Sequence, residues 1–131
     1  MKIRTTLIQA DKLILHDNHI SGENFNFQPI YEKEIYKESD NAYLLKVNVR
    51  IESTRENPFP INVDVSFNAK FEFEEVEDQS LIANYLNIGA IQMMFPYIRS
   101  AITNLTTAAL LPPLILPVVD VRTFIDATKT K

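Results

Sequence analysis

The sequence predicts an α+β fold, with a sheet-forming first half and a helical second half. Two long segments in the first half alternate between apolar and polar residues, which is typical of strands with one buried face. In the second half the apolar residues recur every three or four positions, which is typical of a helix. At 131 residues the chain suits one domain, residues 1–131.

The strand signals come first along the chain. Residues Ile61–Glu74 are apolar at the odd positions and almost entirely polar at the even ones, and Tyr43–Glu52 alternates in the same way. The intervening Ser53–Pro60 has the composition of a turn, so the two segments predict an antiparallel hairpin. Upstream we expect a strand over Thr5–Leu15, a turn over Asp17–Asn24 with Gly22, irregular or extended chain over Phe25–Lys37, and a loop over Glu38–Asn41.

Helical signals follow the hairpin. Asp78 or Ser80 is a suitable cap for a short helix ending near Leu86, and a longer helix is expected over Ile88–Ala109. Pro96 costs that helix a hydrogen bond, so we expect it in the first turns or at a kink. The main apolar stripe is Ile91, Met94, Phe95, Ile98, Ile102, Leu105 and Ala109, and a second stripe is Met93, Tyr97 and Ala101. A helix that is apolar on two sides is expected to lie between layers or partners.

The chain after the long helix cannot remain helical. Pro112 and Pro113 forbid helix, so Leu110–Val119 is expected to be extended. Asp120 is then expected to cap a short C-terminal helix with Val121, Phe124 and Ile125 on one face.

Composition excludes several classes of function. The net charge is −4 and the basic residues are scattered, which argues against a nucleic-acid surface. The chain has no cysteine, which fits a cytoplasmic protein and excludes disulfides and thiolate metal sites. Met1–Leu15 lacks the apolar core of a signal peptide. The longest apolar run, Ala108–Val119, is too short to span a bilayer and carries three prolines, so we expect no membrane insertion.

No arrangement of residues predicts catalysis, a cofactor or a metal site. His16, Asp17 and His19 are residue types that bind metals, but their spacing does not aim them at one ion. The acidic cluster around Glu72–Asp78 is typical of a solvated strand face. With only two glycines there is no phosphate-cradling loop, and no serine has a recognisable base partner. We therefore expect a protein that is not an enzyme.

The proline-rich segment Leu110–Val119 has two interpretations. It could be a buried connector, or it could be a wall against which apolar polypeptide segments bind. Large aliphatic side chains are unusual in a loop, because loops normally run over the surface. Three prolines hold the segment extended, so it would form a rigid apolar ledge.

Two motifs in this region resemble the SecB export-chaperone family. They are Phe95-Pro-Tyr-Ile-Arg99, followed by Ile102 and Leu105, and Leu111-Pro-Pro-Leu-Ile-Leu116. The resemblance is specific over residues 88–127 and is one of pattern and order over residues 10–75. It implies a four-stranded antiparallel sheet with a long helix and a short C-terminal helix.

The resemblance also implies assembly and a binding groove. SecB proteins form homotetramers, as dimers of dimers, with the long helices packed between sheets. They bind unfolded precursor polypeptides in apolar grooves without a nucleotide. Carried onto this chain, the client-binding groove would comprise Phe25, Phe27, Ile30, Tyr31, Leu111, Leu114, Ile115, Leu116, Val118, Phe124 and Ile125. The oligomer interface would comprise Ile91, Met94, Phe95, Ile98, Ile102 and Leu105.

A further implication concerns the SecA motor, to which typical SecB proteins hand their clients. They do so through an acidic sheet face and an acidic C-terminal tail. Asp17 and Asp64 fall at two of the SecA-facing acidic positions, whereas Ser21 occupies the third. The chain ends in Thr128–Lys131, a basic sequence where the typical tail is acidic.

Three functions are consistent with these observations. The first is an ATP-independent holdase for unfolded or export-bound polypeptides, with possible delivery to the Sec translocase. The second is a dedicated chaperone of one antitoxin in a toxin–antitoxin system, since SecB-like chaperones of that kind share the Pro-Tyr-Ile-Arg and Leu-Pro-Pro-Leu features. The third is a carrier of a small apolar ligand.

Overall fold

The computed structural model describes residues 1–129. Its strands are β1 (Lys2–Asp17), β2 (Ile30–Ser39), β3 (Ala42–Ile51), β4 (Ile61–Glu74) and β5 (Ile125–Asp126). Its helices are α1 (Gln79–Asn84), the π-helical segment η1 (Tyr85–Gly89), α2 (Ala90–Ala108) and the 3₁₀ turn η2 (Val121–Thr123).

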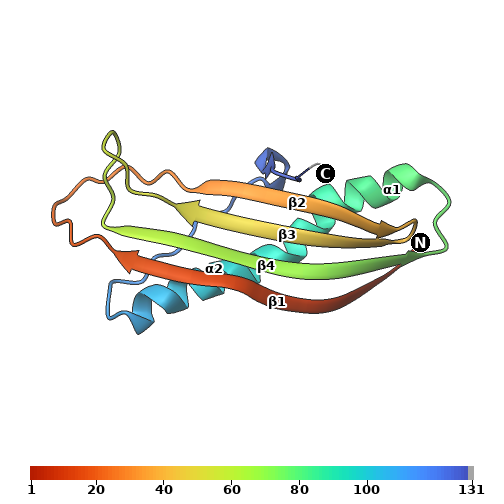
Figure 1. Cartoon of the computed structure of the whole chain (residues 1–131), viewed down its shortest axis with the longest axis horizontal. Coiled ribbons are helices and arrows are strands. Elements are labelled where there is room, and N and C mark those ends of the chain that lie inside the picture. The colour runs from red at the N-terminus through yellow and green to blue at the C-terminus, as the bar shows by residue number, and fades with distance from the viewer. Residues whose placement is uncertain (130–131) are drawn as a thin grey trace.

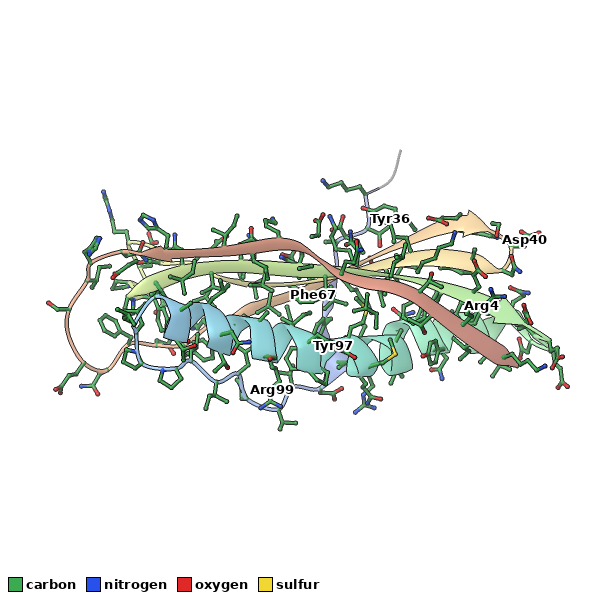
Figure 2. The ribbon with its side chains drawn as sticks, turned by 90° about the horizontal axis from the view of Figure 1, so that it is seen from below. Arg4, Tyr36, Asp40, Phe67, Tyr97 and Arg99 are labelled. Atoms are coloured by element: carbon green, nitrogen blue, oxygen red, sulfur yellow. The ribbon has the colours of Figure 1, made fainter. Side chains whose placement is uncertain are left out.

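One sheet in the order β1-β4-β3-β2-β5 is covered by helices on one face only (Figure 1). The four long strands are antiparallel, and β5 adds a two-residue parallel contact at the outer edge of β2. The view at right angles shows the sheet above and the helical layer below it (Figure 2). The α+β prediction is confirmed, and the expected four-stranded sheet gains a short fifth strand.

The predicted hairpin forms, with β3 and β4 paired from Ala42 opposite Glu72 to Ile51 opposite Val63. Paired residues of antiparallel strands point to the same face of a sheet, so the apolar positions of both strands lie together against α2. Val47, Val49 and Val65 are completely buried there. The alternation seen in the sequence therefore defines the core face of the sheet.

The segment expected to be irregular or extended, Phe25–Lys37, is extended in its second part, where it forms the regular strand β2 from Ile30. Register shows why the strand was missed. Tyr31, Lys33 and Ile35 pair with core-facing residues of β3, so the inner face of β2 carries a lysine at its centre. Lys33 is buried to 8% exposure. A charged residue on the core side breaks the alternation that predicts strands.

Helices α1 and α2 form one continuous helical run joined by η1, whereas the sequence predicted a break near Leu86. The N–H of Ala90 donates to the carbonyl of Tyr85, five residues earlier, which is the π-helical pattern. Gly89 is required at this point, since a Cβ there would lie 2.8 Å from the ring of Tyr85. Asp78 is the N-cap of α1 and accepts from the N–H of Ser80, as one of the two predicted caps.

The predicted C-terminal helix is only the three-residue 3₁₀ turn η2. Asp120 does cap it, by accepting a hydrogen bond of 3.0 Å from the N–H of Arg122. Phe124 and Ile125 do not share a face, however. Phe124 is 5% exposed, whereas Ile125 lies in β5 and is 58% exposed.

Candidate binding groove

The segment Leu110–Val119, called the ledge below, returns from the end of α2 towards β2 without regular secondary structure. Two threonines of α2 hold it in place. The hydroxyl of Thr103 donates to the carbonyl of Leu114 at 2.8 Å, and the N–H of Leu114 donates to the hydroxyl of Thr106 at 3.0 Å. These two bonds satisfy both backbone groups of Leu114, so a segment without strand or helix is nevertheless fixed.

Side chains of the ledge divide into anchors and exposed groups. Leu116 is 1% exposed and belongs to the core, while Leu111 and Leu114 are half-buried against it. Ile115 is 66% exposed and Val118 is 91% exposed. Of the five ledge residues predicted for the groove, one is therefore an anchor, two form a half-buried floor and two project outward.

A first pocket of about 260 Å³ lies at the start of the ledge. The rings of Phe25 and Phe27 lie 6.1 Å and 5.7 Å from Phe59, which lines that pocket. Phe59 was missed because the sequence placed it in a turn between two prolines. The pocket is lined by Phe59, Pro60, Ile61, Thr106, Leu111, Pro112, Pro113 and Leu114.

A second pocket of about 230 Å³ lies at the end of the ledge. Beside it, Tyr31, Phe95 and Phe124 form an aromatic trio in which Tyr31 and Phe124 are 5.3 Å apart. The pocket is lined by Gln92, Phe95, Pro96, Arg99, Val118, Val119 and Val121. The ledge and the two pockets are called the groove below.

Two predicted groove residues lie elsewhere. Ile30 pairs with Arg50, whose side chain is on the face of the sheet away from α2. Ile125 pairs with Glu32, which bonds that same Arg50. Both side chains therefore project from the polar face of the sheet and not towards the ledge. The other predicted groove residues line the groove or the layer directly beneath it.

The residues predicted for the oligomer interface are core residues of this chain. Ile91, Met94, Ile98 and Ile102 are completely buried, Phe95 is 7% exposed, and Leu105 packs against the core cluster. The five buried side chains are not accessible to another subunit in this fold, whereas Leu105 is partly exposed, so a role in an interface stays a prediction for Leu105. The second apolar stripe remains accessible, with Tyr97 52% exposed.

The predicted SecA-facing residues Asp17 and Asp64 do not share a surface. Asp17 pairs with Ile61 on the core-facing side at the end of β1, whereas Asp64 pairs with Ile14 on the polar face. Asp64 accepts hydrogen bonds of 2.8 Å from Lys12 and from Asn48. Burial raises the pKa of Asp64, but the two hydrogen bonds and the charges of Lys12 and Arg50 outweigh it and lower that pKa overall.

Several acidic side chains of the polar face are paired with basic ones. Its ion pairs include Lys46 with Asp11 and Lys70 with Glu38, in addition to the pairs of Asp64 and Arg50. Thr130 and Lys131, at the end of the basic C-terminus, lie outside the described residues. In residues 1–129 no three His, Cys, Asp or Glu side chains gather as a metal site would need. Within the same part of the chain, the helices are too short or too polar to cross a membrane.

Comparison with known proteins identifies the fold and the family. The model of the family "Preprotein translocase subunit SecB" matches residues 30–130. The chain belongs to the SecB family. Two curated SecB relatives, both described as protein-export protein SecB, come from Anaplasma. The one from Anaplasma marginale is 28% identical over 92 residues, and the one from Anaplasma phagocytophilum is 30% identical over 94 residues.

Those SecB alignments cover 70% of this chain but only 53% and 60% of the two relatives. The chain thus spans a little over half the length of the curated relatives that it matches. A solved structure with the same fold is the SecB-like chaperone Rv1957 of Mycobacterium tuberculosis, in complex with a ChAD peptide from the Rv1956 HigA1 antitoxin. It is 19% identical, has a TM-score of 0.68, and the alignment covers 89% of this chain and 90% of that one.

Proposed function

We propose that this SecB-family chain is an ATP-independent holdase that binds unfolded or export-bound polypeptides along the groove. The observation that carries the proposal is that the ledge bears exposed apolar side chains and is also hydrogen-bonded to α2. Ile115 and Val118 project into solvent, while the backbone of Leu114, directly before Ile115, is held to α2 by two hydrogen bonds. Exposed apolar side chains on a fixed backbone are characteristic of a surface that binds another molecule.

The shape of the groove favours an extended polypeptide over a compact ligand. The two pockets are shallow, measure about 230 and 260 Å³, and lie at opposite ends of the ledge. Enclosed sites for drug-sized molecules are usually larger, at about 300–1,000 Å³. Each buried apolar Å² contributes about 25 cal/mol, so affinity would come from many contacts spread along a client and would depend little on its sequence.

Replacing the exposed ledge residues tests this function. We expect Ile115→Ser combined with Val118→Ser to weaken binding of a denatured client about tenfold, because two apolar contacts are lost. The measurements are suppression of aggregation of the denatured client and its dissociation constant. Leu116 is unsuitable for this test because its removal would damage the core.

Leu81→Ser is the matched control, since Leu81 is also an apolar residue exposed to solvent, at 43%, but lies in α1. It should suppress aggregation as well as the unmodified chain. Equal activity of the ledge variant and the control, with both correctly folded, would show that clients bind elsewhere.

A dedicated role for one antitoxin is a second candidate function. It is favoured by the structural neighbour from Mycobacterium tuberculosis, which was solved with an antitoxin peptide. A dedicated chaperone would bind one partner in the native host and would leave unrelated denatured proteins to aggregate. A general holdase would suppress aggregation of all of them, so the assay described above, run with several unrelated clients, separates the two.

The acidic residues on the surface give less support to delivery of clients to SecA. Asp17 and Asp64 project from opposite faces of the sheet, and Asp64 is neutralised by Lys12. Carboxylates that are already paired with lysine or arginine attract a basic partner less strongly than free ones. We therefore propose that the chain holds clients, and we do not propose that it delivers them to SecA.

A further inference from the structure

The second pocket contains a polar group that the apolar groove does not need. The side chain of Arg99 lines this pocket, and its Nε is buried without a hydrogen-bond partner among residues 1–129. Figure 2 shows Arg99 below the sheet, on the side of α2 along which the ledge returns. A buried N–H donor without an acceptor is rare in folded proteins and points to an acceptor supplied from outside the chain.

Only one part of the guanidinium lacks an acceptor. The terminal nitrogens of Arg99 are not among the buried atoms without partners, whereas Nε is. The Nε–H belongs to a pocket that Phe95, Pro96 and three valines also line. One acceptor oxygen in a defined direction would satisfy the Nε–H of Arg99, and this hydrogen bond does not require a negative charge.

Pro96 adds an acceptor to the same pocket. Because proline has no N–H, the carbonyl of Gln92, four residues earlier, lacks its usual helical donor. Gln92 and Pro96 both line the pocket and are exposed to solvent. One side of α2 therefore carries the unpaired Nε–H of Arg99 and, at Gln92, a carbonyl that lacks the usual helical donor four residues later.

We propose that the second pocket binds the main chain of an extended client segment, with a client carbonyl accepting from Arg99 Nε and a client N–H donating to the Gln92 carbonyl. The inference rests on the proposed holdase function and deepens it. An extended chain presents a carbonyl and an N–H within each residue, which matches one donor and one acceptor. A client carboxylate fits less well, because the Gln92 carbonyl would repel it.

Such main-chain anchoring adds affinity without sequence preference, since every residue type offers the same two groups. It also gives the bound segment a register, because the carbonyl must meet Arg99 while side chains pack on Val118 and Val119. The neighbouring first pocket contains no arginine or lysine among its lining residues. The polar anchor thus lies at one end of the groove.

Amide-to-ester replacement in a peptide provides the test. The probe is a fluorescein-labelled peptide of about twelve residues, chosen from a peptide array as a tight binder of the full-length chain. A series of analogues replaces one amide at a time with an ester, which weakens the carbonyl acceptor and deletes the N–H. We expect one or two positions to weaken binding about fivefold, and Arg99→Met to weaken binding of the parent peptide by a similar factor. The decisive result is that Arg99→Met removes the sensitivity at the ester position that weakens the acceptor.

Arg122→Met is the matched control, because Arg122 is an exposed arginine of the same region whose guanidinium pairs with Asp120 at 2.8 Å. It should retain the full ester sensitivity. The inference is overturned if ester replacement has equal effects on the unmodified chain and on Arg99→Met. It is also overturned if a change from Glu to Gln in the peptide accounts for the effect of Arg99, or if Arg99→Met changes the mass of the assembly. If no array peptide binds at all, the holdase function itself fails.

Discussion

Asp64 shows how single residues stabilise the polar face of the sheet. Its two oxygens receive one hydrogen bond each from β1 and β3, from Lys12 and from Asn48. The pKa of Asp64 is lowered as a result, although burial opposes the shift. A carboxyl group whose pKa is lower in the folded state stabilises the fold above its unfolded pKa of about 3.9 and loses that contribution as pH falls through the folded pKa.

Asp64→Asn should therefore destabilise the protein at pH 7 by about 1 kcal/mol. The difference should shrink below about pH 4, where the carboxyl group of the unmodified protein becomes protonated. Urea unfolding at both pH values and at a fixed protein concentration measures it. Asp40→Asn, at a fully exposed carboxyl group, should change little at either pH. A difference that persists unchanged at pH 3 would contradict the ionic account.

Residue-level predictions from the sequence failed where they depended on the side of a strand. Ile30 and Tyr31 are neighbours in sequence and both are apolar, yet only Tyr31 faces α2. Register decides this, and a shift of one residue exchanges the two faces. Lys33 on the core side removed the alternation from which that register could have been inferred.

Among the elements, the C-terminal segment is attached to the sheet mainly through one ring. Phe124 packs between Tyr31 and Phe95, and the backbone beyond it makes few bonds with β2. The N–H of Ala127 donates to the carbonyl of Lys33 at 2.8 Å, and the N–H of Ile35 donates to the hydroxyl of Thr128 at 2.9 Å. A strand of two residues cannot hold this edge by itself.

Phe124→Ala should therefore detach the C-terminal segment from β2, with a loss of about 3 kcal/mol in local stability. Amide hydrogen exchange checks this directly, because Ile35 and Ala127 should lose protection while β3 and β4 keep theirs. Ile125→Ala, at the neighbouring exposed residue, should leave protection unchanged. If the amide of Ile35 is equally protected in Phe124→Ala and in Ile125→Ala, the ring of Phe124 does not hold β5 against β2.

Elements with strong periodicity were predictable, and their junctions were not. The hairpin of β3 and β4 and the helix α2 follow from spacing alone, because burial on one face imposes a period on the sequence. The π-helical segment has no such signature, since its extra residue is accommodated by one close contact, of Gly89 with the ring of Tyr85 four residues earlier. The prolines of the ledge located the groove in the sequence. The contribution of Phe59, Thr103 and Thr106 to it could be recognised only in the packed structure.

At the scale of the whole molecule, the outer stripe of α2 is the surface that we propose for assembly into a homotetramer. The inner stripe is already buried against the sheet, so the apolar side chains of α2 that a second layer could contact include Met93, Tyr97 and Ala101. Tyr97, labelled in Figure 2, is the most exposed of these three, at 52%.

Tyr97→Glu should dissociate the assembly, because a carboxylate would have to be buried between apolar surfaces. Light scattering should find about four chains of 15.1 kDa for the unmodified protein and fewer for this variant. Ala83→Glu, on the exposed side of α1, should keep the full mass. If light scattering finds that the unmodified protein is monomeric, the proposed interface is wrong.

The π-helical segment η1 acts as a phase adjustment between two helices. A residue of an α-helix advances by about 100° around the axis, so the one extra residue in η1 sets the direction in which α1 faces. With it, Ile82 and Leu86 of the first turns and Ile91 and Met94 of α2 all reach the same sheet. Deleting one residue within η1 would replace its π-helical hydrogen bond with the α-helical pattern and would turn Ile82 away from the sheet, by about 100° relative to α2. The number of residues in this region is therefore as constrained as their identity.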